Sequence, residues 1–171
     1  MAVTAFVAGG SNLGDRLEFL NQAKEILDST SGIHVSGESS IFETIPVGGP
    51  AQGLYLNVVW EIRTDLTVES FYGVLKGIED RLDRVRSASN APRTIDLDLL
   101  FYGDHVLKNS KLCVPHPRLQ ERLFVLAPLL ELAPDFRHPV LNQTIRQLYE
   151  AIAVKNPADV KNFGKIYERN C

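Results

Sequence analysis

The feature that most constrains this chain is a strand-like segment in which acidic and aliphatic residues alternate, Ile95-Asp96-Leu97-Asp98-Leu99. Because successive side chains of a strand point to opposite faces, we expect both carboxylates on one face and the aliphatic residues on the other. Two adjacent carboxylates repel each other unless a cation lies between them, and a pair of Mg²⁺ ions is the obvious candidate. Two surface acids on the solvated face of an antiparallel sheet are the alternative.

Basic residues cluster just upstream of the aspartates, at Arg81, Arg84, Arg86 and Arg93. The helix dipole favours cations at a helix end, which explains one or two of these arginines. It explains less well why the basic run continues to Arg93, whose side chain can reach an anion held by the metal ions. Metal ions, a carboxylate pair and arginine together indicate phosphoryl transfer from a nucleotide.

Composition narrows the classes of function. The 171 residues have a formal net charge of −3, whereas general nucleic-acid binders are usually basic. The sequence has no apolar stretch long enough to span a bilayer. We interpret Cys113 and Cys171 as free thiols in a reducing compartment. We therefore expect a soluble cytoplasmic protein that binds small molecules, without a nucleic-acid or membrane partner.

Apolar periodicity predicts the element order β-α-β-β-α-β in the first hundred residues. The four strands are expected at Val3–Ala8, Ser36–Thr44, Leu54–Arg63 and Ile95–Tyr102. This order is typical of a ferredoxin-like α+β fold, an antiparallel sheet with helices on one face. Beyond Gly103, prolines punctuate short helices, including one within Leu141–Ile152, and we interpret this part as a short C-terminal helical extension. Residues 1–171 are expected to form a single domain.

The turn from Gly9 to Gly14 has the glycine spacing of a phosphate-binding loop. Asp15 and Arg16 stand where such a loop has lysine and serine or threonine, so the lysine contact with phosphate is missing. We favour a strand-to-helix turn, with Ser11 or Asn12 as the helix cap.

Three other side chains are candidates for ligand contacts. Tyr55 and Asn57 share the polar face of their strand, where they suit either a flat heterocycle or ordinary cross-strand packing. His116 is flanked by two prolines and lies between Lys111 and Arg122, which suits a phosphate contact. A single histidine is nevertheless more often structural.

These segments together resemble the 6-hydroxymethyl-7,8-dihydropterin pyrophosphokinase family of folate biosynthesis. The resemblance extends from about Val3 to about Ala133. The matching segments are Gly10–Arg16, Tyr55–Asn57, Glu79 with Arg84, Pro92–Asp98, and Val114–Arg118 followed by Arg122, Phe124 and Pro128. The resemblance implies that a diphosphate passes from ATP, the co-substrate, to the hydroxymethyl group of the pterin, with release of AMP. The chain departs from the family pattern at Asn90 and Ala91, where an aromatic residue and glycine are usual, and at Lys76, where some members have glutamine.

The resemblance also implies roles for individual residues. Asp96 and Asp98 would bind two Mg²⁺ ions and, with Arg84 and Arg93, form the catalytic set. The nucleotide would contact Glu79, Arg84, Arg86, Arg93, Leu99, Lys111, His116 and Arg122. The pterin would contact Thr44, Val47, Tyr55, Asn57, Asp96 and Phe124. Other enzymes of the folate pathway are possible partners.

Three other functions remain open on the sequence, and a non-catalytic regulatory domain is the weakest of them. A two-metal nucleotidyltransferase would also use two aspartates, but it would release pyrophosphate instead of AMP. A ferredoxin-like RNA-binding module would need exposed aromatic residues on the central strands and a basic face, where this chain has aspartates.

Overall fold

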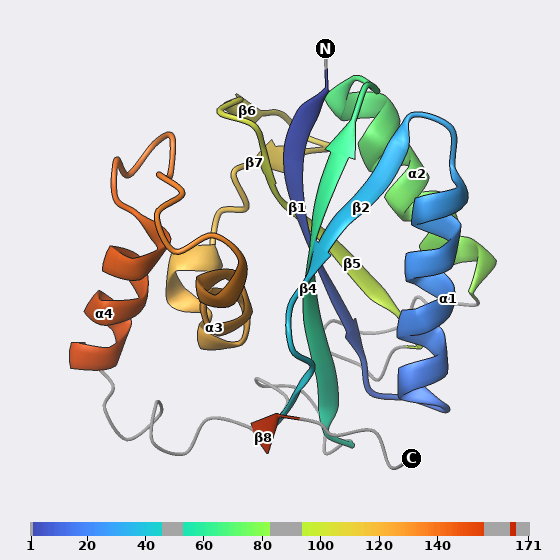
Figure 1. Ribbon diagram of the computed structural model, residues 1–171, viewed down its shortest axis with the longest axis horizontal. Coiled ribbons are helices and arrows are strands. Elements are labelled where there is room, and N and C mark those ends of the chain that lie inside the picture. The colour runs from blue at the N-terminus through green and yellow to red at the C-terminus, as the bar shows by residue number, and fades with distance from the viewer. Residues whose placement is uncertain (1, 46–52, 83–93, 156–164, 167–171) are drawn as a thin grey trace.

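A computed structural model describes residues 2–45, 53–82, 94–155 and 165–166 of the chain (Figure 1). The elements are β1 (Val3–Ser11), α1 (Arg16–Ser29), β2 (Ile33–Glu38), β3 (Phe42–Thr44), β4 (Tyr55–Thr64), α2 (Val68–Arg81), β5 (Asp96–Tyr102), β6 (Leu107–Lys108), β7 (Cys113–Val114), the 3₁₀ helix η1 (Leu119–Glu121), α3 (Leu123–Leu132), α4 (Ile145–Lys155) and β8 (Lys165–Ile166). Among these residues, no helix has both the length and the apolar character needed to cross a membrane.

The main sheet has six strands in the order β5-β1-β4-β3-β8, and β2 pairs with β4 next to β3. All of these pairings are antiparallel. The single strand predicted over Ser36–Thr44 is two strands, β2 and β3, because regular strand structure is interrupted from Ser39. The Ser39 hydroxyl accepts a hydrogen bond from the Val59 amide (2.9 Å), and the Ser39 amide donates to the Val59 carbonyl (2.9 Å). The side chain thus replaces a backbone group in the ladder.

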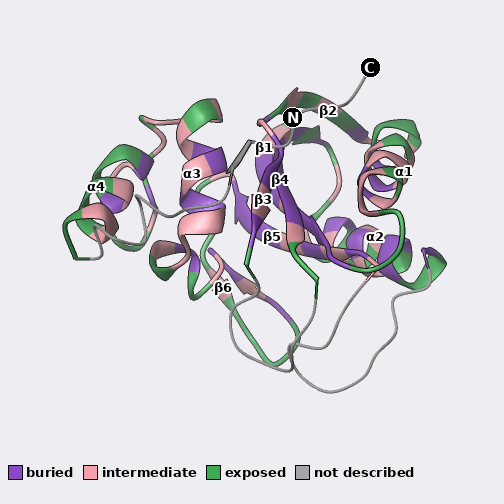
Figure 2. Cartoon of the chain, turned by 90° about the horizontal axis from the view of Figure 1, so that it is seen from below, coloured by how far each residue is buried: buried purple, intermediate pink, exposed green. Residues whose placement is uncertain are grey.

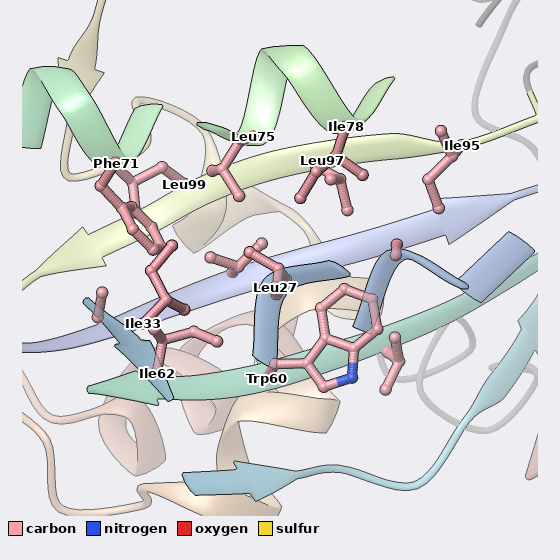
Figure 3. Packing of buried hydrophobic residues seen from close by; sticks show 14 of the residues in the cluster. Leu27, Ile33, Trp60, Ile62, Phe71, Leu75, Ile78, Ile95, Leu97 and Leu99 are labelled. Carbon is pink, nitrogen blue, oxygen red and sulfur yellow. The ribbon is translucent and has the colours of Figure 1, made fainter. Parts of the chain in front are cut away.

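Helices cover both faces of the sheet (Figures 1 and 2). Helices α1 and α2 pack on one face around Trp60, Phe71 and Leu75, as Figure 3 shows in close-up. Helices α3 and α4 pack on the other face against Phe6 and Phe101. The prediction of helices on one face therefore holds for α1 and α2 only. Burial of the large apolar side chains on the second face requires the C-terminal helices to cover it.

Helix starts depend on single polar side chains. Thr67 caps α2, because its hydroxyl accepts a hydrogen bond from the Ser70 amide (3.2 Å). The predicted cap of α1 by Ser11 or Asn12 is wrong, because β1 continues to Ser11. Asp15 caps α1 instead, since its carboxylate accepts a hydrogen bond from the Glu18 amide (3.2 Å).

Candidate active site

The two aspartates of β5 lie on one face of the strand, as expected. Their aliphatic neighbours Leu97 and Leu99 are buried in the core beneath α2, while both aspartates are half-buried on the opposite face. On the adjacent strand β1, Gly10 pairs with Asp96 and Ala8 pairs with Asp98. The residues paired with the two aspartates are therefore small, and neither places a large side chain beside a carboxylate.

A polar row runs from Asp96 across three strands. Gly10 pairs with Asp96 on one side and with Asn57 on the other, and directly paired residues project from the same face of a sheet. Asn57 is only 8% exposed, and its amide nitrogen donates a hydrogen bond to the Thr44 hydroxyl (2.5 Å). Thr44 in turn pairs with Tyr55. The carboxylate, the amide and the aromatic ring thus lie at one end of the same face.

The carboxyl group of Asp98 resists ionisation. Burial raises the pKa of Asp98 to about 6, and repulsion by Asp96 adds to this rise, while Lys76 and Arg122 act in the opposite direction. The nearest Arg122 nitrogen, Nη1, is 3.9 Å from Asp98 Oδ2, which is a loose ion pair. A divalent cation bound beside Asp98 would favour the ionised form of this carboxyl group.

Two carboxylates alone do not enclose a metal ion. Within the described part of the chain, no group of three His, Cys, Asp or Glu side chains could hold one. Mg²⁺ is usually bound by one or two carboxylates together with substrate phosphates and water. The donor set therefore fits an ion that arrives with a nucleotide.

A pocket of about 200 Å³ lies beside β5, between α2 and the segment around β7. It is lined by Tyr72, Lys76, Leu97, Asp98, Leu99, Lys111, Leu112, Cys113, His116 and Pro117. The structure thus brings together Leu99, Lys111 and His116, three of the residues that the family resemblance assigns to the nucleotide, and that role stays a prediction. The sequence-based site set omitted Tyr72, Lys76 and Cys113. The first two, with Glu79, form a stripe at helical spacing on α2, which is the signal that could have revealed them.

Glu79 is fully buried and binds the outer edge of β5. One carboxylate oxygen accepts a hydrogen bond from the Leu97 amide (2.9 Å), and the other accepts one from Lys76 Nζ (3.0 Å). Lys76 Nζ also donates to the Leu97 carbonyl (3.3 Å). These contacts fix the residue between the two aspartates. The predicted contact of Glu79 with a nucleotide stays a prediction.

His116 presents a neutral ring to the pocket. Burial and the nearby Arg122 charge lower the pKa of His116 to about 4. Its Nδ1 accepts a hydrogen bond from the Arg118 amide (3.2 Å), so the ring proton resides on Nε2 at neutral pH. Arg122 lies over the half-buried ring of Phe124, 5.6 Å from its centroid. A neutral N–H donor and a cation thus accompany the aspartates.

Four of the predicted site residues lie outside the described residues, namely Val47, Arg84, Arg86 and Arg93. Their roles stay predictions.

Comparisons with known proteins agree with this geometry. The family described as 7,8-dihydro-6-hydroxymethylpterin-pyrophosphokinase (HPPK) matches residues 6–134. The chain is 44% identical over 128 residues to the 2-amino-4-hydroxy-6-hydroxymethyldihydropteridine pyrophosphokinase of Bacillus subtilis, which covers 75% of this chain and 77% of that protein. It is 39% identical over 147 residues to the "Folic acid synthesis protein fol1" of Pneumocystis carinii, covering 86% of this chain but 20% of that protein.

Among solved structures, a Plasmodium falciparum HPPK-DHPS triple mutant with pteroate superposes with a TM-score of 0.77 at 16% identity. The match covers 97% of this chain and 47% of that one, so this chain spans about half its length. At this identity the likeness shows the fold alone. The extent of the family match and the identity to the Bacillus protein lead to one conclusion: this chain belongs to the 7,8-dihydro-6-hydroxymethylpterin-pyrophosphokinase family.

Proposed function

We infer that this chain transfers a diphosphate from ATP to the hydroxymethyl group of 6-hydroxymethyl-7,8-dihydropterin and releases AMP, in folate biosynthesis. Family membership supports the activity. The structural observation behind it is the row in which Asp96, Gly10 and Asn57 are paired across three strands. This row places a carboxylate pair suited to metal-bound phosphates beside an amide suited to a heterocycle.

The acceptor subsite, as we propose it, consists of Thr44, Val47, Tyr55, Asn57, Asp96 and Phe124. A pterin is flat, with hydrogen-bonding groups along its edge, so it needs aromatic faces and fixed polar partners. The bond from Asn57 Nδ2 to the Thr44 hydroxyl (2.5 Å) orients the amide before any ligand binds. A group fixed in advance loses less conformational freedom on binding.

Asp96 and Asp98 would hold Mg²⁺, and the number of ions, two, is part of the proposal. When bound, the ions would neutralise charge on the triphosphate and assist loss of the alcohol proton. The raised pKa of Asp98 supports this assignment, because a bound cation would offset both burial and the repulsion by Asp96 that raise it. Both aspartates would keep the diphosphate close to the hydroxymethyl oxygen in the acceptor subsite.

The nucleotide would lie along the outer edge of β5. We propose contacts with Glu79, Arg84, Arg86, Arg93, Leu99, Lys111, His116 and Arg122. The neutral ring of His116 would donate from Nε2 to a phosphate oxygen, and Arg122 would add a charge-assisted hydrogen bond. Arg84 and Arg93 would act on the diphosphate as the bond from the pterin oxygen to the β-phosphorus forms and the bond to AMP breaks.

We also propose a ferredoxin-like topology for β1 to β5, with a C-terminal helical extension and a single domain over residues 1–171. The sheet order β5-β1-β4 with β2 beyond β4 supports this topology. We further propose a cytoplasmic location and association with other folate-pathway enzymes. The name HPPK-DHPS of the similar Plasmodium chain supports such a partner.

The deciding experiment incubates the protein with ATP, Mg²⁺ and 6-hydroxymethyl-7,8-dihydropterin and identifies the products. AMP and a diphosphorylated pterin are expected in equal amounts. Release of pyrophosphate would instead identify a nucleotidyltransferase. Salt-sensitive binding of RNA without any AMP would favour the RNA-binding module.

A further inference from the structure

A second group of contacts lies behind the acceptor subsite, where β1 passes into α1. Arg16 Nη1 lies 2.7 Å from a carboxylate oxygen of Glu43 in β3 and donates a hydrogen bond to the Leu54 carbonyl (2.9 Å). From the same turn, Asn12 Nδ2 donates to the Gly53 carbonyl (3.3 Å). Two side chains of one turn thus bind two successive carbonyls just before β4 begins.

These contacts join the strands that supply the acceptor subsite. Glu43 and Thr44 are neighbours in β3, so their side chains project from opposite faces of the sheet. Arg16 therefore binds β3 from the α1 side, while Thr44 lies on the face that carries Asp96. On that face Thr44 pairs with Tyr55. A shift of β3 against the start of β4 would displace these subsite side chains together.

The Arg16 contacts are partly shielded from solvent. The side chains of Arg16 and Glu43 are 25% and 30% exposed, respectively. Fully exposed ion pairs contribute little, but a guanidinium that serves a carboxylate and a carbonyl at once has fixed geometry. Lysine, a compact point charge, would reproduce only part of this arrangement.

We propose that Arg16 is a positioning residue for the acceptor subsite. By joining β3 to the residue before β4, it holds Thr44, Tyr55 and Asn57 in the arrangement that the pterin requires, without touching either substrate. The inference rests on the proposed function. Since the pocket beside β5 lies two strands away from β4, removal of Arg16 affects the pterin and spares the nucleotide.

The test measures both substrates on Arg16→Met. Calorimetry with 6-hydroxymethylpterin, in the presence of Mg²⁺ and a non-hydrolysable ATP analogue, is expected to give a Kd about tenfold above wild type. The Kd of the analogue and kcat at saturating pterin are expected to change less than about twofold. Arg16→Lys is expected to fall between wild type and Arg16→Met. Arg146→Met is the matched control, since it removes an exposed arginine paired with Asp135 (3.2 Å) and is expected to change neither Kd.

Two results would overturn the proposal while leaving the proposed function intact. One is a wild-type pterin Kd in Arg16→Met, and the other is an equal loss of affinity for both substrates, which would indicate general loosening of the fold. If Arg16→Met does not fold, Glu43→Gln removes the ion pair but keeps the Leu54 contact. That variant must raise the pterin Kd by about threefold or more. A wild-type protein that binds no pterin and forms no AMP would overturn both proposals.

Discussion

The two faces of the sheet differ in how completely they are covered, and β5 shows this difference within one strand. Toward α1 and α2, Leu97 and Leu99 enter a continuous apolar core. Toward α3 and α4, Leu100 and Phe101 are covered, whereas Asp96 and Asp98 are only half-buried. Along β5, the face toward α1 and α2 is therefore closed, whereas the face toward α3 and α4 is closed only at one end.

This difference explains how a small fold keeps a charged site without losing its core. The alternation of side chains that directs leucines inward also sets the spacing of the carboxylates on the other face. The larger of the two apolar clusters lies on the closed face, and the proposed chemistry occupies the open end of the other. Substitutions on the two sides of β5 should therefore have separable effects.

The largest effect is expected from removal of the carboxylates. Asp96→Asn and Asp98→Asn should each lower kcat by about 10³-fold or more, because a neutral amide cannot hold a divalent cation beside the triphosphate. AMP formation measures the rate, and circular dichroism should show an unchanged fold. Near-normal turnover in either variant would remove that aspartate from the proposed site.

At Leu97, between the two aspartates, we expect the opposite result, namely a loss of stability without a loss of turnover. Leu97→Ala should lower the free energy of unfolding by about 2–5 kcal/mol, because a fully buried leucine leaves a cavity beneath α2. Guanidinium denaturation measures the loss. Retained kcat in the folded fraction would sharpen the contrast between the two sides of β5. A loss of unfolding free energy below about 1 kcal/mol would show that neighbouring side chains repack into the cavity.

A smaller effect is expected in the polar row. Asn57→Ala should weaken pterin binding by about 1–3 kcal/mol, because the ligand then leaves a polar group unpaired. Binding of the ATP analogue should not change. Calorimetry separates the two affinities, and an unaltered pterin affinity would place the heterocycle elsewhere.

Ionisation of Asp98 should also lower the free energy of unfolding of the ligand-free protein. Its pKa is about 6 in the fold and 3.8 as an ordinary side chain. The native state therefore binds the proton more tightly, and stability is lost as pH rises from about 4 to above 6. After allowance for partial exposure, Asp98→Asn should stabilise the protein by about 1–2 kcal/mol at pH 8.

At pH 3.5, where the native carboxyl is already protonated, this advantage of Asp98→Asn should disappear. Mg²⁺ with a non-hydrolysable ATP analogue should reduce it at pH 8 by stabilising the wild type, and chelation of the metal should restore it. Thermal unfolding measured at both pH values tests the sign. A variant that is less stable than wild type at pH 8 would contradict the assignment.

The smallest effect concerns the protonation of the His116 ring. Because burial lowers the pKa of His116 to about 4, its NMR signals should show no titration between pH 6 and 8. A midpoint near 6.5 for His116 would show that the ring is open to water in solution.

Local patterns predicted much of the closed face. The element order of the first hundred residues was predictable because apolar periodicity depends on residues within one or two turns of each other. The interruption between β2 and β3 was missed, because it depends on distant partners. The Ser40 amide and hydroxyl both donate to the Glu131 carboxylate of α3, 91 residues away (2.8 and 2.7 Å).

The candidate site was predictable to a similar extent. The prediction that Asp96 and Asp98 lie on the same face of β5 followed from strand geometry alone. The second layer around them did not, because Lys76 and Glu79 contact β5 only after α2 has packed on the sheet. A charged pair on a helix also fits an ordinary solvated surface, so the sequence could not reveal that Glu79 is buried.

The contacts of Glu79 and His116 with β5 have a consequence for self-association. β5 is the last strand on its side of the sheet, and exposed edge strands invite pairing with other molecules. Here the Leu97 amide is occupied by Glu79, and the Leu100 carbonyl accepts from the His116 amide (3.0 Å). An incoming strand would have to displace both. The side chain of Glu79 and the backbone of His116, at the edge where we propose that a nucleotide binds, therefore also protect the protein from intermolecular sheet formation and aggregation there.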